Sequence, residues 1–107
     1  MLFDVRTLRR QGWTIVAVVG DVDLATMPTL HHHLESADGD RVALDLSGVD
    51  HLDPVTFGVV IVGSLRATRR GARFAVIAPE SRPRELLAES RLDEVLTVVG
   101  ELSELVD

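Results

Sequence analysis

The chain has 107 residues, 46% of them hydrophobic and 26% charged, which is the composition of a folded domain rather than of a disordered segment. Its formal net charge of −6 argues against nucleic-acid binding, which normally requires a basic face for the phosphates. Because the chain has no cysteine, disulfides and zinc–thiolate sites are excluded. We predict a single domain over residues 1–107.

The N-terminal segment is interrupted by charge. Asp4, Arg6, Arg9 and Arg10 precede any long apolar run, so we expect no secretory signal. No apolar run approaches the ~20 residues that span a bilayer. We therefore expect a cytoplasmic protein without direct membrane insertion.

Five segments have the pattern of β-strands. Residues 2–8 alternate apolar and polar side chains, as a half-buried strand does, and a turn at residues 11–12 precedes a nearly continuous apolar segment. Trp13 begins that segment and is expected in the core or on a face of the sheet. The predicted strands are residues 2–8, 13–19, 42–46, 73–78 and 95–99.

Helical spacing appears between these strands. Met27, Leu30 and Leu34 are spaced for one helix, with Asp23 or Thr26 as its cap. A second helix is predicted to open within residues 79–83, and a last helical turn or two within residues 101–106. Helices that alternate with strands predict a layered α/β domain.

For residues 55–70, local sequence patterns give conflicting predictions of secondary structure. The β-branched run at residues 59–62 and two glycines favour a strand. Against this, Asp53 is a good N-cap, and Pro54 suits the first helical position. The segment also ends as helices do, with arginines followed by Gly71. The balance predicts a helix.

No catalytic or metal-binding pattern stands out. His31, His32 and His33 would point about 100° apart on a helix, so their rings cannot converge on one ion, and a solvated helix face is expected. His51 with Asp53 could act as a base with an orienting acid, but no nucleophile motif or glycine-rich phosphate loop accompanies them. We expect a protein that is not an enzyme and that uses no cofactor or metal.

The sequence DLSGVDHLDPVTFG at residues 45–58 resembles the signature of the STAS domain, the family of bacterial anti-sigma factor antagonists. That signature reads roughly Asp-Leu-Ser-Gly-Val-x-Phe-Leu-Asp-Ser-Ser-Gly-Leu-Gly. Residues 20–26 are similar to the family's Gly-Glu-Leu-Asp-x-x-Thr segment. Residues 90–92 stand where the family has a Ser-Gly-Leu step, and the resemblance extends over residues 3–100.

The resemblance implies the STAS fold, a mixed sheet of four to five strands with helices mainly on one side and the first strand antiparallel to the second. It also implies a protein partner, an anti-sigma kinase of the GHKL type. In the family, the loop before the first helix and the start of the helix after the third strand dock onto that kinase. Transferred to this chain, the partner surface comprises Asp21, Asp23, Asp53, Pro54, Val55 and Thr56.

Pro54 departs from the family. It stands where the family has the Ser that is phosphorylated as a switch, and it has no hydroxyl, so phosphorylation at Pro54 is chemically excluded. Thr56 is the nearest hydroxyl, but two residues along a helix rotate a side chain by roughly 200°. We expect Thr56 at the helix start or core edge, with a displaced phosphosite as the alternative. Ser47 is expected to stabilise a turn before Asp53.

The favoured function is that of an anti-sigma factor antagonist in a partner-switching pathway, always competent to bind or controlled by abundance or by another protein. The alternative is a STAS subunit of a membrane lipid-transport ABC complex, bound to its ATPase. A decoy that occupies a partner without releasing anything is the third possibility. For each we expect a monomer or weak homodimer.

Overall fold

The computed structural model describes residues 3–105, and a five-stranded sheet in the order β1-β2-β3-β4-β5 forms its frame. β1 is antiparallel to β2 across a two-residue turn in which Gln11 and Gly12 both have positive φ, and the other neighbours are parallel. The expected mixed sheet, with its first strand antiparallel to its second, is thereby confirmed. The strands are β1 (Phe3–Arg10), β2 (Trp13–Val22), β3 (Arg41–Leu52), β4 (Arg73–Ile77) and β5 (Thr97–Val99).

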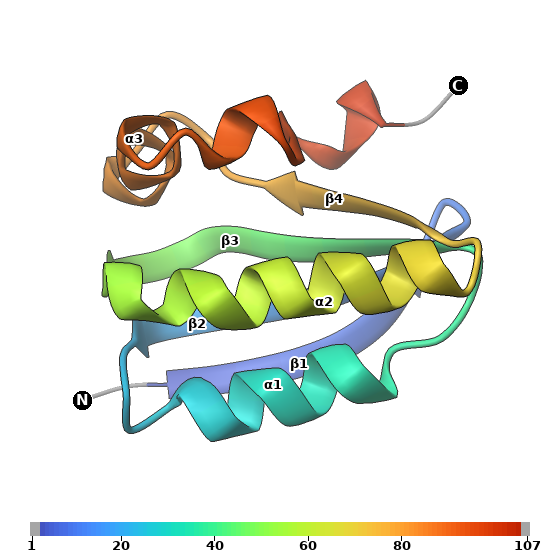
Figure 1. Cartoon of the computed structure of the whole chain (residues 1–107), viewed down its shortest axis with the longest axis horizontal. Helices are drawn as coiled ribbons and strands as arrows, with labels where there is room; N and C mark the ends of the chain where they lie inside the picture. Colours follow the sequence, from blue (N-terminus) through green and yellow to red (C-terminus); the bar gives the residue numbers. More distant parts are fainter. Residues whose placement is uncertain (1–2, 106–107) are drawn as a thin grey trace.

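The helices lie mainly on one face of the sheet (Figure 1). Leu30 and Val60, from the first two helices, and Leu87 from the third join Val16 and Leu44 of the sheet in one core. The helices are α1 (Met27–Ser36), α2 (Phe57–Arg69) and α3 (Arg82–Glu89), and the short 3₁₀ turns are η1 (Pro54–Thr56), η2 (Leu92–Glu94) and η3 (Leu102–Glu104).

The opposite face of the sheet has a smaller apolar cluster. Trp13, Ile15 and Ile77 lie in it, and Leu105 beyond η3 packs against them. Trp13 is buried, as predicted. No helix within residues 3–105 is both long and apolar enough to cross a membrane.

The third strand differs most from its prediction. A turn was expected after Leu46, but β3 continues to Leu52 because its backbone goes on pairing with β2, whose strand likewise runs past Val19 to Val22. Register shifts interrupt this pairing. A Cβ on Gly48 would lie 3.0 Å from the Val18 carbonyl oxygen, so the strands approach each other as closely as only glycine allows. Ser47 therefore lies in a strand, where its hydroxyl donates to the Asp45 carboxylate.

Most other boundaries shift by a few residues. β1 extends to Arg10, and Leu2 lies outside the described residues. β5 begins at Thr97 rather than Val95, because η2 and its cap occupy the residues before it. The predicted C-terminal turn is η3, and Val106 again lies outside the described residues.

The disputed segment is a helix, as predicted. η1 leads into α2, which includes the whole β-branched run. The helix ends at Arg69, and Gly71, just past the cap Arg70, has a φ of +80°, the left-handed conformation that glycine adopts without strain.

Candidate functional site

The two segments of the predicted partner surface lie side by side at the ends of β2 and β3. Asp21 pairs with His51 and Val22 pairs with Leu52 in the parallel ladder. One residue further on, the Asp53 N–H donates to the Val22 carbonyl at 2.9 Å. The carboxylates of Asp23 and Asp53 thus follow directly after paired residues of neighbouring strands.

The Asp23 loop is held by its own hydrogen bonds. Asp23 Oδ1 accepts from the N–H groups of Ala25 and Thr26 at 2.9 and 3.1 Å. Thr26 Oγ1 donates to the Asp21 carbonyl at 3.0 Å, and α1 begins just after it. Asp23 and Thr26, the two predicted caps, therefore cooperate to fix the loop before any partner arrives.

The start of η1 is fixed in the same manner. Asp53 is extended (φ −78°, ψ 124°), as the residue before a proline must be, and its Oδ1 accepts from the Val55 N–H at 3.0 Å. Pro54 occupies the first position of the turn, where a missing N–H has no cost. Both Pro54 and Val55 are exposed, and Val55 retains 51% of its accessible surface.

Thr56 does not share this exposure. Its side chain is fully buried, and Oγ1 donates to the Asp53 carbonyl at 2.6 Å. The same carbonyl also accepts from the Thr56 N–H at 2.9 Å, so the bond provides the buried hydroxyl with an acceptor. The accessible part of the predicted surface therefore excludes Thr56 and consists of two exposed residues, Pro54 and Val55, and three half-buried ones, Asp21, Asp23 and Asp53.

The histidines of α1 contact single polar side chains rather than one another's ligand atoms. His31 lies 3.0 Å from Glu35 on the same helix, and His33 lies 3.3 Å from the Thr7 hydroxyl on β1. His51 is exposed near the acidic loops. Within residues 3–105, no three His, Asp or Glu side chains are grouped to hold a metal ion.

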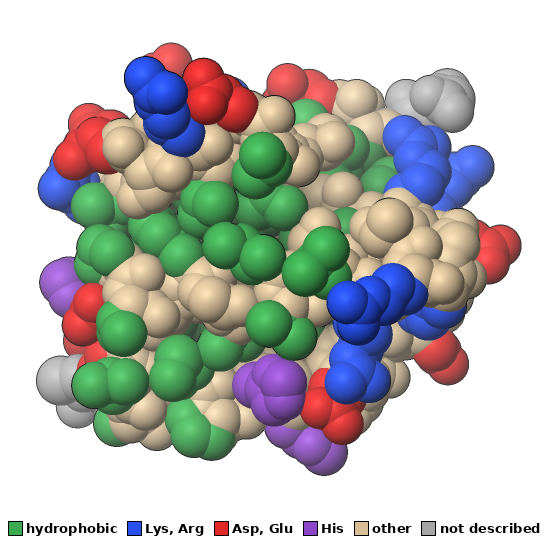
Figure 2. Space-filling model, viewed as in Figure 1, with side chains coloured by type: hydrophobic (Ala, Val, Ile, Leu, Met, Phe, Trp, Pro, Cys, Tyr) green, Lys and Arg blue, Asp and Glu red, His purple; other side chains and the backbone are tan. Residues whose placement is uncertain are grey.

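Sequence reasoning missed an apolar outer face on α2. Val62 and Leu65 keep 46% and 49% of their accessible surface, and Ile61 is also exposed. Figure 2 shows hydrophobic side chains gathered over α2 and toward α3. The spacing of Val55, Val62 and Leu65 at helical intervals could have indicated this face, but the strand-like composition of the run obscured it.

Comparisons with known proteins agree with this fold. A family model described as "Mlab, STAS domain" matches residues 6–101. Among the similar solved structures, three that are each under 25% identical illustrate the fold. The chain matches none of the curated proteins with which it was compared.

The first structure is an anti-sigma factor antagonist from Mycobacterium paratuberculosis (20% identity, 96% of this chain and 90% of that one, TM-score 0.85). The second is a sulfate transporter family protein from Wolinella succinogenes (15% identity, 90% of this chain and 83% of that one, TM-score 0.74). The third is the Bacillus cell fate determinant SpoIIAA in its phosphorylated form (12% identity, 97% of this chain and 96% of that one, TM-score 0.67).

Proposed function

This chain belongs to the STAS domain family, and we propose that it acts as an anti-sigma factor antagonist that binds an anti-sigma kinase of the GHKL type in a partner-switching pathway. One observation carries the proposal: the Asp53 N–H bonds to the Val22 carbonyl at 2.9 Å, which fixes the Asp23 loop beside the exposed start of the α2 segment. A preformed surface loses little conformational entropy on binding.

The chemistry of this surface suits a protein partner. Asp23 and Asp53 place negative charge beside the exposed Val55. An apolar contact with a charged rim is the usual anatomy of a protein interface, in which the charges steer the partner and fix its register. Binding rather than catalysis is the proposed activity, and the cytoplasm is its proposed location.

The proposed regulator is not switched by phosphate at the helix start. Pro54 has no hydroxyl, and the Thr56 hydroxyl is buried and bonded to the Asp53 carbonyl. Phosphopeptide mapping after incubation with the kinase and ATP tests this directly. We expect no phosphate on Thr56, and a phosphate there would contradict a regulator controlled by its abundance or by another protein.

The binding surface is tested with a double variant, Asp23→Asn with Val55→Trp, and the purified kinase. Asparagine keeps the Oδ1 acceptor for the Ala25 and Thr26 N–H groups but removes the charge. The matched control is Asp4→Asn with Val19→Trp, a cross-strand pair on the face of the sheet opposite the helices. We expect at least a tenfold loss of affinity for the first variant only. Equal affinities would refute the surface.

A second candidate is the STAS subunit of a membrane lipid-transport ABC complex, bound to its ATPase. It is favoured by similarity to a sulfate transporter family protein and by a family model whose description names Mlab rather than an antagonist. A pull-down with the tagged chain from native lysate separates the candidates. Recovery of a transporter ATPase supports the second, and recovery of a GHKL-type protein supports the first.

A further inference from the structure

We propose that the outer face of α2 is a docking strip for one amphipathic helix of the partner protein, a helix with a basic side chain at one end and a carboxylate at the other. The strip comprises Val55, Gly58, Val62, Leu65 and Arg69. The inference rests on the proposed function, because it extends the partner surface from the helix start along the whole of α2.

The middle of the strip is apolar where a solvated helix would be polar. Val62 and Leu65 are about half exposed and lie three residues apart, so they are neighbours on one face. A β-branched residue such as Val62 lowers helix propensity, and here it gains little burial in return. A groove beside them is lined by Val62, Leu65 and three arginines. An apolar side chain of the partner, placed over this groove, would bury the apolar surface of Val62 and Leu65 that the fold leaves exposed.

Gly58 leaves a notch in the strip between Val55 and Val62. It is exposed, and a Cβ built on it would meet nothing within 4 Å. The fold itself therefore does not require glycine at this place, although glycine costs roughly 1 kcal/mol relative to alanine inside a helix. A notch between two apolar side chains is a suitable seat for one side chain of an opposing helix.

The two ends of the strip carry opposite charge. Asp53 and Asp23 lie at the beginning, and Arg66 and Arg69 lie in the last turns. Arg66 lies 3.8 Å from Glu35, whereas Arg69 forms no ion pair with any residue between 3 and 105. Residues 55–69 span about 21 Å, which is about four helical turns. Charge complementarity therefore favours a partner helix of about 14 residues whose end near Asp53 is basic and whose end near Arg69 is acidic.

The test is site-specific photo-crosslinking in cells of the source organism, with an aliphatic diazirine amino acid similar in size to leucine at Val55, at Leu65, or at Val19 as the control on the opposite face. We expect Val55 and Leu65 to crosslink to the same partner chain, at positions about ten residues apart in one helix. An Asp or Glu should lie within one turn of the position linked to Leu65. Val19 should give no product.

Two variants of the Leu65-labelled chain sharpen the test. Gly58→Leu should lower the crosslink yield at least tenfold without lowering the melting temperature, since it fills the notch and improves helix propensity. Arg69→Glu should lower the yield severalfold, whereas Arg6→Glu on the opposite face should not. Unchanged yields for Gly58→Leu and Arg69→Glu would overturn the strip.

The remaining outcomes separate the two proposals. Crosslinks from Val55 alone would leave the proposed function standing and overturn the strip. Crosslinks from neither position would count against both. A product that joins two copies of this chain, or a linked partner segment without the expected carboxylate, would also overturn the strip as proposed.

Discussion

Helices α2 and α3 pack on the same face of the sheet, yet they differ at the start, along the outer face and at the end. α2 begins after the buried hydroxyl of Thr56, exposes apolar side chains and is followed, just past its cap, by Gly71 with positive φ. α3 begins after an exposed Ser81, exposes an arginine with two glutamates and is followed, just past its cap, by Arg91 with positive φ. The α3 surface is suited to water, whereas the α2 surface is suited to a partner. Their difference locates the proposed function on α2.

The largest expected effect concerns the hydroxyl residues at the two helix starts, Thr56 before α2 and Ser81 before α3. Thr56→Glu would place a charge in a fully buried position and remove the bond to the Asp53 carbonyl, so we expect a loss of about 3–5 kcal/mol in the free energy of unfolding. Ser81→Glu on α3 should change stability by less than about 0.5 kcal/mol. Urea unfolding measures both. Equal effects would show that the two helix starts do not differ.

The outer faces are compared by their effect on affinity. Val62→Glu should weaken binding of the partner kinase by tenfold or more, about 1.4 kcal/mol, because it introduces a charge into the apolar strip. Its effect on stability should be small, since glutamate is the better helix former. Ala88→Glu, at an exposed position of α3, is the matched control and should leave affinity unchanged. A loss of affinity from Ala88→Glu alone would reverse the comparison.

The helix ends give a reciprocal pair of substitutions. Gly71→Ala should cost about 1–2 kcal/mol from its φ of +80° alone, because an added Cβ meets nothing within 4 Å. Arg91→Gly should stabilise by about 0.5–1 kcal/mol, since it relieves a φ of +59° but makes the unfolded chain more flexible. Urea unfolding checks the sign of both changes in the free energy of unfolding, provided that its dependence on urea concentration is the same in the variants and in the original chain. A neutral Gly71→Ala would contradict the conformational argument.

Sequence patterns predicted the fold better than they predicted the surface. The Asp53-Pro54 start and the Gly71 end outweighed the β-branched run, because caps and helix breakers act locally and can be read locally. The length of β3 could not be predicted in this manner. Its Ser-Gly step has turn composition, and only pairing with β2 reveals a strand.

The site residues also divide into those whose role depends on sequence neighbours and those whose role depends on tertiary packing. Asp53 and Pro54 could be placed because their role at a helix start depends on neighbours in sequence. Thr56 was included in the transferred partner surface and was also expected at the helix start or core edge. Its burial agrees with the second expectation and removes it from the accessible surface. Burial depends on which face of a helix meets the sheet, and a short helix with apolar residues on several faces leaves that face undetermined.

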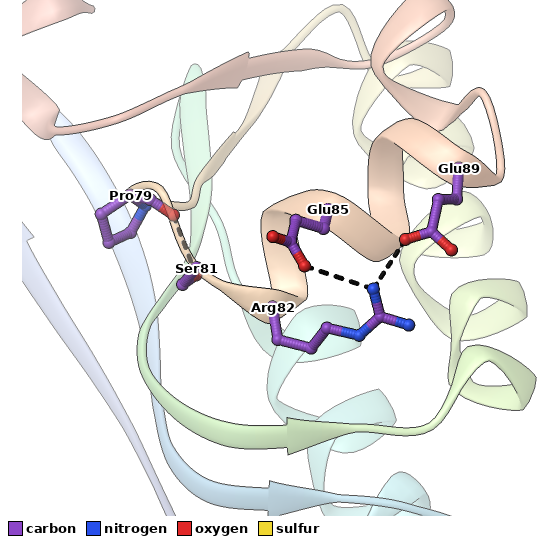
Figure 3. A network of polar contacts seen from close by, with 5 residues as sticks. All are labelled: Pro79, Ser81, Arg82, Glu85 and Glu89. Atoms are coloured by element: carbon purple, nitrogen blue, oxygen red, sulfur yellow. Dashed lines mark hydrogen bonds and ion pairs between the residues drawn. The ribbon is translucent and has the colours of Figure 1, made fainter.

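The smallest expected effect concerns the ion pairs of α3, in which Arg82 extends between Glu85 and Glu89 (Figure 3). The hydrogen bond to Glu85, and then that to Glu89, raises the pKa of Arg82, but arginine is already charged at neutral pH. Since all three side chains are more than half exposed, water and salt screen the pairs. We therefore expect Arg82→Ala to leave both the urea-unfolding midpoint and the partner affinity unchanged. Urea unfolding and a binding titration check this. A clearly lowered unfolding midpoint, or weaker partner binding, would mean that the outer face of α3 is more than a solvated surface, and the contrast with α2 would fail.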